Sequence, residues 1–410
     1  MVALVDSFNC NYNYCKCNRK TQSQLVQEAH PQRSMMNWER LRPPAATLQT
    51  RLAAQACLEK LATEEIARVC SATSPYAAIQ AIAQHLTQDD ATHDKVCLVR
   101  ASPGKQTVQA HTADGNDVAP SNISAWPLWF QDGPDRFEIP LLYLLRSESV
   151  AGLQTAIFET ANRGILCNDA EITSSRWPKS VQPAVPVWLA SSVNGIPYDP
   201  ASGQEALAIL RAAMQALYAD HAPGFFYLTL HDDEDNVPAP SRDDVRDAYK
   251  GMYRLSAAFR PKAPAIRLLG AGKALGKVIR AADLLQEDWD VACEVWSCPS
   301  YTRLAREGYE VERWNMLHPL SMKKTSYIQR CLGSEQSPVL AVTGYGQHIA
   351  HQIGGVVSAR FVALGADSHH GASGFPSVYW IVFTAIKALC EAGKLPMRRA
   401  EQALKRYALT

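Results

Sequence analysis

The sequence has no long apolar run and almost no excess of charge of either sign. Its longest apolar run, Val378 to Ile386, ends at Lys387 and is far too short to span a bilayer. The 41 Lys and Arg residues against 40 Asp and Glu leave a net charge of +1, which argues against broad attraction to nucleic acid or to an anionic membrane surface. A small anionic substrate is still compatible, because a few residues suffice to bind it.

The N-terminal region lacks the apolar segment of a signal peptide, since Asp6 and a polar run follow the first residues. We therefore expect a cytoplasmic protein. The 11 cysteines are odd in number and scattered, which favours reduced thiols over a disulfide framework. Cys10, Cys15 and Cys17 lie close together, but no second cysteine pair follows at zinc-finger spacing. Residues 1–47 are predicted to be a flexible extension.

Helix-like and strand-like segments alternate along the rest of the chain. Helical periodicity extends over residues 48–70, 74–86, 150–161, 203–219, 273–285, 301–308, 346–354, 377–393 and 395–409. Apolar, strand-like runs occupy residues 94–101, 137–145, 185–192, 224–230, 265–270, 290–297, 338–344 and 360–366. The alternation predicts two α/β domains, each with a mainly parallel sheet flanked by helices.

An acidic, proline-containing segment, HDDEDNVPAPSRDD at residues 231–244, divides the two halves. It cannot bury itself and is the best linker in the chain. We place the domains at residues 48–235 and 251–410, with a linker at 236–250. Gly393 is expected to end the helix before it.

A glycine-rich segment, LLGAGKALG, follows a predicted strand and opens a helix, which invites a dinucleotide interpretation. Gly270, Gly272 and Gly276 are spaced one residue wider than the tight fingerprint, and no acidic residue closes a second strand at the usual distance. A plain strand-to-helix turn is favoured.

Four histidines could meet at the carboxyl ends of neighbouring strands. His348 and His351 are one helical turn apart, and His369 and His370 follow a strand, with Asp367 as the one obvious extra ligand. Zinc accepts imidazoles, but diagnostic ligand spacing is missing. Solvated surface histidines are favoured, and no metal is predicted.

The segment VERWNMLHPL, residues 311–320, concentrates a charged pair, an indole, an amide and an imidazole. From the residues alone we favour a packing role, in which Trp314, Met316 and Leu317 fill the joint between the domains from a loop and Glu312 pairs with Arg313.

The same segment carries a family resemblance. ERWNMLHP stands as it does in the homodimeric type of the thiamine-diphosphate-dependent, decarboxylating component of the bacterial pyruvate dehydrogenase complex. In the same order, VNGIPYDP at residues 193–200, GFFYLTL at 224–230 and CPSYTRLAREG at 298–308 are similar to further family segments. The resemblance extends from about Ser74 to the C-terminus and is strongest after Val193.

This resemblance implies a transketolase-like architecture in which phosphate-binding, pyrimidine-binding and C-terminal domains follow one another. Residues 48–235 would then be a degenerate pyrimidine-binding domain, and residues 251–410 a transketolase C-terminal domain. The family's Gly-Asp-Gly motif, which holds Mg²⁺ against the diphosphate, does not occur. We therefore expect the phosphate-binding domain to be missing, and the family's cofactors, thiamine diphosphate and Mg²⁺, not to be bound by this chain alone.

The resemblance also implies altered site residues. Gln109 falls at the position of the family's cofactor-activating glutamate, and an amide cannot exchange the proton that a carboxylate gives the aminopyrimidine ring. The family's histidine-rich segment before VNGIPYDP has no counterpart between Ser174 and Ser192. The retained motif residues, with an expected place at the cleft or an interface, are Tyr198, Asp199, Glu312, Arg313, Trp314, Asn315, His318 and Asp367.

Three hypotheses of function follow. The first is a divergent, non-catalytic homologue of the decarboxylating component that acts as a structural or regulatory subunit. It would form a homodimer, or a heterodimer with a full-length paralogue, within or beside the pyruvate dehydrogenase complex. The second is one chain of a split thiamine-diphosphate-dependent 2-oxo acid dehydrogenase, active with a partner. The third is a small-molecule or metal-binding protein.

Overall fold

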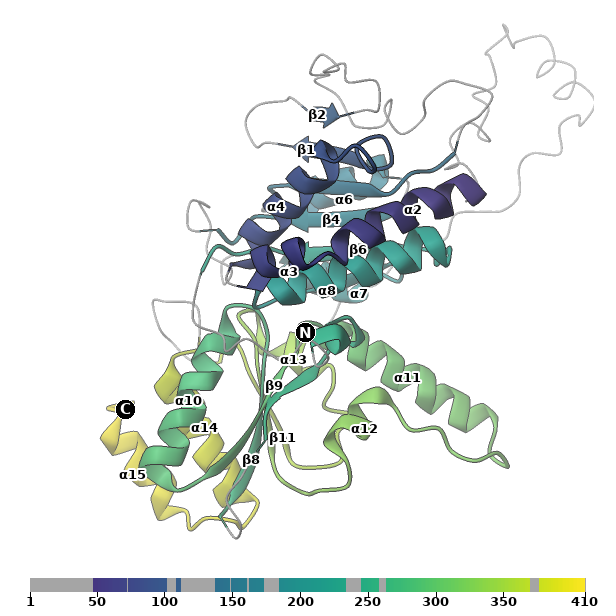
Figure 1. The fold of residues 1–410 in the computed structure, drawn as a ribbon. Helices are drawn as coiled ribbons and strands as arrows, with labels where there is room; N and C mark the ends of the chain where they lie inside the picture. Colours follow the sequence, from purple (N-terminus) through teal and green to yellow (C-terminus); the bar gives the residue numbers. More distant parts are fainter. Residues whose placement is uncertain are drawn as a thin grey trace, which may run out of the picture. The chain divides into compact units, whose positions relative to one another are not determined.

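The computed structural model describes residues 47–71, 73–101, 108–111, 137–147, 149–160, 162–172, 184–233, 245–257, 263–368 and 376–409. These residues all belong to one compact unit, residues 44–410. Within them, no helix is long and apolar enough to cross a membrane. The residues carry two β-sheets, each flanked by helices (Figure 1).

The first sheet has the strand order β2-β1-β3-β4-β6-β5. Its strands are β1 (Cys97–Ala101), β2 (Val108–His111), β3 (Leu141–Leu145), β4 (Gly164–Asn168), β5 (Gly195–Tyr198) and β6 (Phe225–Thr229). The edge strand β2 is antiparallel to β1, and the other pairs are parallel. Every residue of β3, β4 and β6 is buried, as expected for parallel strands covered on both faces.

Within the described residues, seven helical segments accompany the first sheet. They are α2 (Leu48–Leu61), α3 (Glu64–Ser71), α4 (Pro75–Gln88), α6 (Val150–Glu159), α7 (Ala184–Ser191), α8 (Gly203–Met214) and the π-helical turn η3 (Gln215–Ala219). The hydroxyls of Ser74 and Ser202 cap α4 and α8, and Pro75 takes the first helical position, where a missing N–H costs nothing. Helices α2, α3 and α4 pack against α8 (Figure 1).

The second sheet has the order β11-β10-β8-β9-β7. Its strands are β7 (Tyr253–Ser256), β8 (Ala265–Gly270), β9 (Ala292–Ser297), β10 (Val339–Val342) and β11 (Phe361–Leu364). Edge strand β7 is antiparallel to β9, and the other pairs are parallel. Both sheets are therefore mainly parallel, which confirms the predicted fold class.

The helices of the second sheet cover both of its faces. They are α10 (Ala274–Trp289), α11 (Tyr301–Leu317), α12 (Tyr327–Leu332), α13 (Gln347–His351), α14 (Val378–Glu391) and α15 (Arg398–Arg406), and the 3₁₀ helix η4 (Arg246–Lys250) precedes β7. Ile266 and Leu268 of β8 pack with α10 and α14, whereas Leu269 packs with α11 and α13. This alternation of side chains along one strand builds two cores, one on each face of the sheet.

Helix α11 also binds the segment that enters β5. The Arg306 guanidinium donates hydrogen bonds to the carbonyl oxygens of Gly195 and Ser192, both at 2.5 Å. The Ser300 hydroxyl, which caps α11, donates to the carbonyl of Pro197 at 2.6 Å. The first half of α11 is therefore fastened to the first sheet.

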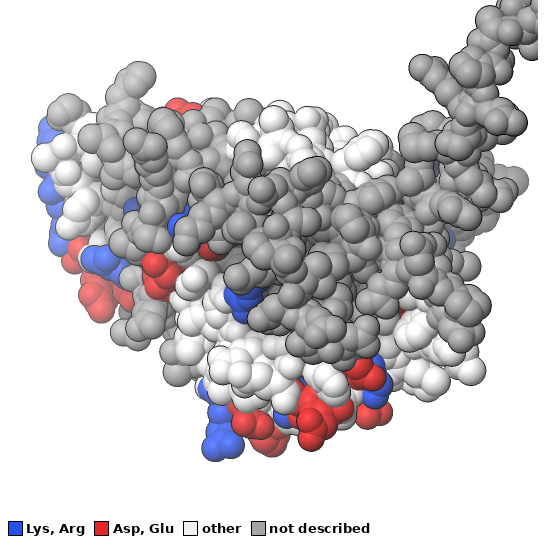
Figure 2. Space-filling model, turned by 90° about the horizontal axis from the view of Figure 1, so that it is seen from above, with Lys and Arg blue, Asp and Glu red and all other residues white. Residues whose placement is uncertain are grey.

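The surface carries both signs of charge. On the described part of the face shown in Figure 2, acidic and basic side chains lie close to one another. This distribution agrees with the net charge of +1.

Most predicted elements are confirmed, and two are wrong. Residues 185–192, predicted as a strand, form helix α7, because Pro186 lies in the first turn, where proline is tolerated, and a short apolar run has no period of its own. Helix α11 does not end near residue 308 but continues to Leu317, because no glycine or proline intervenes after Gly308 until Pro319. Gly393 follows α14 with φ +70°, as predicted for a helix C-terminal residue.

The linker and the reduced cysteines stay predictions. The linker placed at 236–250 contains the helix η4 at its end, which packs against α8, and the remainder to residue 244 lies outside the described residues. The eight cysteines within the described residues are free thiols. Cys10, Cys15 and Cys17 lie outside the described residues.

Candidate functional site

The carboxyl ends of β5, β6, β8 and β10 meet around a small, partly open cavity. In open parallel sheets, ligands bind beyond these strand ends, so this cavity is the first candidate for a site. Its volume is ≈ 40 Å³. The residues lining it are Pro186, Leu189, Pro197, Tyr198, Asp199, Tyr227, Thr229, Ala271, Pro299, Ser300, Tyr301, Thr302, Thr343, Tyr345 and Ile349.

Tyr198, a retained motif residue, serves packing at this cavity. Its side chain is 1% exposed, and its ring stacks on Phe226 with centroids 5.8 Å apart. The Tyr198 hydroxyl donates a hydrogen bond to the carbonyl of Tyr249 at 2.5 Å. Burial raises the pKa of Tyr198 well above its ordinary value, so the phenol stays protonated.

Asp199 lies against the glycine-rich turn that follows β8. The Gly272 amide donates to the Asp199 carbonyl at 2.9 Å, and the Asp199 amide donates to the carbonyl of Pro299 at 2.7 Å. Gly272 has φ +49°, and a Cβ atom placed on it would lie 2.2 Å from the Asp199 carboxylate oxygen Oδ1. The place where a dinucleotide phosphate would approach this turn is therefore taken by Asp199, which supports the plain-turn interpretation of Gly270, Gly272 and Gly276.

A buried carboxyl that the sequence did not single out joins α8 to the second sheet. Glu205 is fully buried and accepts hydrogen bonds from the hydroxyls of Tyr253 and Ser297 and from the Ala201 amide, at 2.7, 2.6 and 2.7 Å. Burial raises the pKa of Glu205, while these donors act in the opposite direction. The Ser-x-x-Glu pattern at Ser202 was the available signal, but it is typical of helix capping and did not indicate a long-range contact.

Hydroxyl groups form the remaining polar wall of the cavity. Thr229 and Tyr345 share a hydrogen bond of 2.8 Å, and the Asn168 amide donates to the Tyr227 hydroxyl at 2.9 Å. Burial raises the pKa values of Tyr227 and Tyr345, so both phenols are neutral. Among the described lining residues, Asp199 is the one charged side chain, and none is a lysine, arginine or histidine.

Thiamine diphosphate does not fit this cavity. A diphosphate taken out of water requires a metal ion or cationic side chains around it, and the described lining provides a carboxylate instead. The volume of ≈ 40 Å³ is also far below the roughly 300–1,000 Å³ of small-molecule sites. No catalytic step through the cofactor can be derived from these residues.

Gln109 does not approach this cavity. It lies in β2, opposite Arg100 of β1, at the edge of the first sheet. Three strands, β1, β3 and β4, separate β2 from β6. The structure therefore does not bring Gln109 to the edge that carries Tyr198 and Asp199.

The ERWNML part of the motif lies in the last turns of α11, which corrects the predicted loop. The Trp314 ring stacks on His318 with centroids 4.4 Å apart, and the Lys324 ammonium lies 4.0 Å from the Trp314 ring centroid. The Asn315 side chain exchanges two hydrogen bonds with the backbone of Lys324, at 2.8 and 2.9 Å. The motif thus fastens the segment after the helix back onto the helix.

The joint-filling role predicted for this motif is also wrong. Met316 is 71% exposed and Leu317 60% exposed, so neither fills a joint within this chain. Glu312 and Arg313 are exposed, and within the described structure no ion pair joins them. The physical reason is that α11 extends past the second sheet, beyond the reach of the elements that cover its first turns.

The histidine candidates do not form a metal centre among the described residues. His348 and His351 lie on α13, and Asp367 accepts a hydrogen bond from the Gln347 amide at 2.7 Å. His348 and Asp367 both lie beside Gly346. Within the described residues, no three His, Cys, Asp or Glu side chains converge to hold a metal ion. His369 and His370 lie outside the described residues.

The chain matches a known domain family in its second half. Residues 251–379 match the family described as "Transketolase-like TK C-terminal domain". This part of the chain is transketolase-like. The matched residues include β7 to β11 and the helices α10 to α13, so the family accounts for most of the second sheet and its cover.

Curated relatives extend the resemblance. The chain is 35% identical over 232 residues to the pyruvate dehydrogenase E1 component of Cupriavidus necator, and 34% identical over 231 residues to that of Pseudomonas aeruginosa. Each alignment covers 54% of this chain and 26% of the relative. The predicted resemblance to the decarboxylating component is therefore confirmed, while the alignments span about a quarter of the relatives' length.

A solved structure supports the fold independently. Transketolase from Leishmania mexicana superposes with a TM-score of 0.51 at 16% sequence identity, covering 84% of this chain and 50% of that chain. At this identity the likeness concerns the fold alone. The superposition includes the first sheet as well as the second, because 84% of the chain is more than the second half alone contains.

Proposed function

We propose that this chain is a divergent relative of the pyruvate dehydrogenase E1 component that does not catalyse decarboxylation alone and acts as a structural or regulatory subunit. The observation that carries this proposal is the exposed apolar surface at the end of α11. We call it the α11 surface and define it by five side chains: Tyr309, Met316, Leu317, Leu320 and Met322.

These side chains are exposed to an unusual degree. Leu320 and Met322 are 101% and 91% exposed, and all five lie within 14 residues of sequence. Single exposed apolar residues are ordinary, but five of them within one short segment favour a surface for another protein. Charges of both signs surround the group, with Glu310 and Glu312 beside Arg313 and Lys323. A second chain can pair with both signs, and a second copy of this chain offers the same signs in return.

The cavity at the strand ends supports the non-catalytic part of the proposal. It is small, it has no cationic side chain among its described lining residues, and Asp199 fills the approach to the glycine-rich turn. Under this proposal, residues 48–235 and 251–410 keep the folds of a pyrimidine-binding and a C-terminal domain, and retain their packing more than their polar site. Thiamine diphosphate and Mg²⁺ would be held, if at all, with groups from another chain.

The test combines hydrodynamics with calorimetry. Sedimentation of the full chain, alone and mixed with a pyruvate dehydrogenase E1 component, should reveal a homodimer or a heterodimer. Leu320→Glu should weaken that association at least tenfold, because a charge would be buried in an apolar contact. Phe158→Glu is the matched control, since Phe158 of α6 is 76% exposed and lies outside the α11 surface.

Thiamine diphosphate with Mg²⁺ should give no saturable heat with the chain alone. Saturable binding and pyruvate turnover by the chain alone would overturn the proposal. Turnover that arises on mixing with a partner chain, and that neither chain has alone, would instead establish a split enzyme. A monomer at all concentrations, with and without the partner, would remove the role of the α11 surface.

A further inference from the structure

The last two helices carry an excess of positive charge. Residues 387–406 contain six Lys or Arg residues and two Glu residues, in a chain whose net charge is +1. This segment includes the end of α14, the turn after it and α15, which packs against α14 (Figure 1). Positive charge is therefore concentrated in one short segment, and such a pattern favours contact with an acidic partner.

Half of these cations have no carboxylate partner. Three pair with carboxylates of α10, α14 or α15 at 2.6, 2.6 and 2.7 Å, respectively Lys387 with Glu391, Lys405 with Glu401 and Arg406 with Asp288. The other three, Lys394, Arg398 and Arg399, form no ion pair in the described structure. Lys394 and Arg398 are exposed and Arg399 is partly exposed, so a partner can reach all three.

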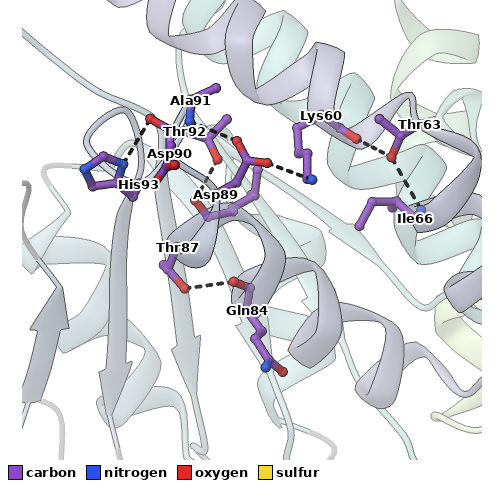
Figure 3. A network of polar contacts seen from close by, with 11 residues as sticks. Lys60, Thr63, Ile66, Gln84, Thr87, Asp89, Asp90, Ala91, Thr92 and His93 are labelled. Carbon is purple, nitrogen blue, oxygen red and sulfur yellow. Dashed lines mark hydrogen bonds and ion pairs between the residues drawn. The ribbon is translucent and has the colours of Figure 1, made fainter.

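The stability of α15 does not explain the two unpaired arginines. Arg398 and Arg399 are the first two residues of α15, where the helix dipole is positive and a cation disfavours the helix. Lys60 shows the opposite arrangement, because it lies in the last turn of α2, where a cation is favourable, and pairs with Asp89 at 2.8 Å (Figure 3). An anionic partner would turn the charges of Arg398 and Arg399 into favourable contacts.

The turn that carries the free cations is held by the chain's own contacts. The amides of Lys394 and Leu395 donate hydrogen bonds to the Leu389 carbonyl at 2.9 and 3.3 Å. The Arg399 guanidinium carbon lies 5.7 Å from the ring centroid of Trp289, a cation–π distance. A surface that is ordered before it binds loses little conformational entropy when a partner arrives.

An apolar side chain and the flanking ion pairs narrow the class of partner. Met397 lies between the free cations in sequence and is 60% exposed, and methionine and arginine are both enriched at protein interfaces. Glu391 and Glu401 lie on either side of residues 394–399 and neutralise the neighbouring lysines. A phosphate backbone requires cations repeated along its length, so the short cationic stretch favours an acidic protein segment over nucleic acid.

We infer that this part of the chain binds a short acidic segment of another protein, whose carboxylates contact the three free cations while an apolar side chain contacts Met397. We call it the α15 surface and define it by four side chains: Lys394, Met397, Arg398 and Arg399. The α15 surface shares no residue with the α11 surface. The inference therefore goes beyond the proposed function, and neither depends on the other.

The test titrates the full chain into a fluorescein-labelled peptide, Glu-Glu-Leu-Glu-Glu-Leu-Glu-Glu, and measures fluorescence anisotropy at low ionic strength. We expect saturable binding that weakens as salt is added, because salt screens exposed charges. The same peptide with glutamine at every glutamate position should bind at least about tenfold more weakly, because three ion pairs are lost. A labelled thymidine oligonucleotide of the same length should bind at least about threefold more weakly than the acidic peptide.

Matched variants separate the α15 surface from general charge. Arg398→Gln combined with Arg399→Gln should weaken binding of the acidic peptide at least about fivefold. Arg68→Gln combined with Arg280→Gln removes two exposed cations of α3 and α10, and should leave the affinity within about twofold of the starting chain. Met397→Ser changes no charge and should weaken binding at least about threefold, because an apolar contact is lost.

Thermal unfolding supplies a second readout. The variant without Arg398 and Arg399 should unfold at the same or a higher temperature than the starting chain, because both cations oppose the helix dipole. Four results would overturn the inference: no saturable binding of the acidic peptide, equal losses from the two double variants, equal affinity for the glutamine peptide, or equal or tighter binding of the oligonucleotide. Should the first double variant fail to fold, Lys394→Gln and Met397→Ser decide the same question, because unchanged affinity in both also overturns it.

Discussion

Two sequence motifs that resemble the same family differ in their surroundings in this molecule. Residues 193–200, VNGIPYDP, end at the joint between the sheets, where Tyr198 and Asp199 are buried and bonded to the chain's own backbone. Residues 312–319, ERWNMLHP, end a helix beyond the second sheet, and Met316 and Leu317 of this motif are mostly exposed. The inner motif is bonded within this chain, whereas Met316 and Leu317 of the outer motif are exposed in the described structure. The difference separates contacts that hold the fold together from a surface that we propose takes part in association.

Glu205→Leu should have the largest effect on the joint between the two sheets. The change leaves the Tyr253 and Ser297 hydroxyls and the Ala201 amide without their buried acceptor. We expect the free energy of unfolding to fall by about 3–5 kcal/mol. Urea unfolding measures it, with Glu59→Leu on the exposed face of α2 as the control, which should change stability by less than about 0.5 kcal/mol. A loss at Glu205 no larger than the control would show that the joint does not depend on this carboxyl.

Gly272→Ala tests the contact between the glycine-rich turn and Asp199. The new Cβ atom would lie 2.2 Å from the Asp199 carboxylate, and φ of +49° disfavours any L side chain. We expect the free energy of unfolding to fall by about 3 kcal/mol. Gly393→Ala is the matched control, because Gly393 has φ +70° and no atom within 4 Å of the added Cβ, so strain alone should cost about 1–2 kcal/mol. Chemical unfolding measures both variants. An equal fall in unfolding free energy for Gly272→Ala and Gly393→Ala would mean that the Asp199 side chain can move aside at no cost.

The pH dependence of stability sharpens the same comparison. Burial raises the folded-state pKa of Glu205 above its ordinary value of 4.5, so the folded chain binds this proton more tightly than the unfolded chain. The stability that Glu205 contributes is therefore complete below pH 4.5 and is lost as pH rises through the folded pKa, with a slope of at most about 1.4 kcal/mol per pH unit. Stability should be measured against pH for the parent chain and Glu205→Gln. Their difference should decline over this window, and a difference that grows with pH would show that the three donors outweigh burial.

Trp314→Ala should have the smallest effect on folding and a large effect on association. It removes the stack on His318 and the contact with Lys324, both near the surface. The free energy of unfolding should therefore change by about 1 kcal/mol. Association through the α11 surface should weaken, because the segment that carries Leu320 and Met322 loses its attachment. Sedimentation measures this, with Phe158→Ala of α6 as the exposed aromatic control. If Trp314→Ala leaves association unchanged, the motif does not contribute to the interface.

The sequence predicted the elements better than it predicted their contacts. The uninterrupted apolar residues Phe225 to Leu228 predicted a buried parallel strand, and β6 is one. Residues 185–192 were misassigned because their apolar run is too short to show a period. The stack of Trp314 on His318 follows helical i, i+4 spacing, but the sequence does not predict it because the predicted helix ends near residue 308.

The candidate site was harder to predict because its contacts join distant parts of the chain. Gly272 was recognised as a turn residue, but its neighbour Asp199 lies more than 70 residues earlier. Glu205 resembled an ordinary capping residue, and nothing in its local sequence indicates the hydroxyls of Tyr253 and Ser297.

The attachment of Lys324 to Asn315 and Trp314 also bears on how fast a partner is captured. A segment that is already ordered requires no folding step after the first encounter, so the association rate constant should lie in the ordinary range of roughly 10⁵–10⁷ M⁻¹ s⁻¹ and show a single kinetic phase. Differences in the affinity of partners would then come from how long each stays bound.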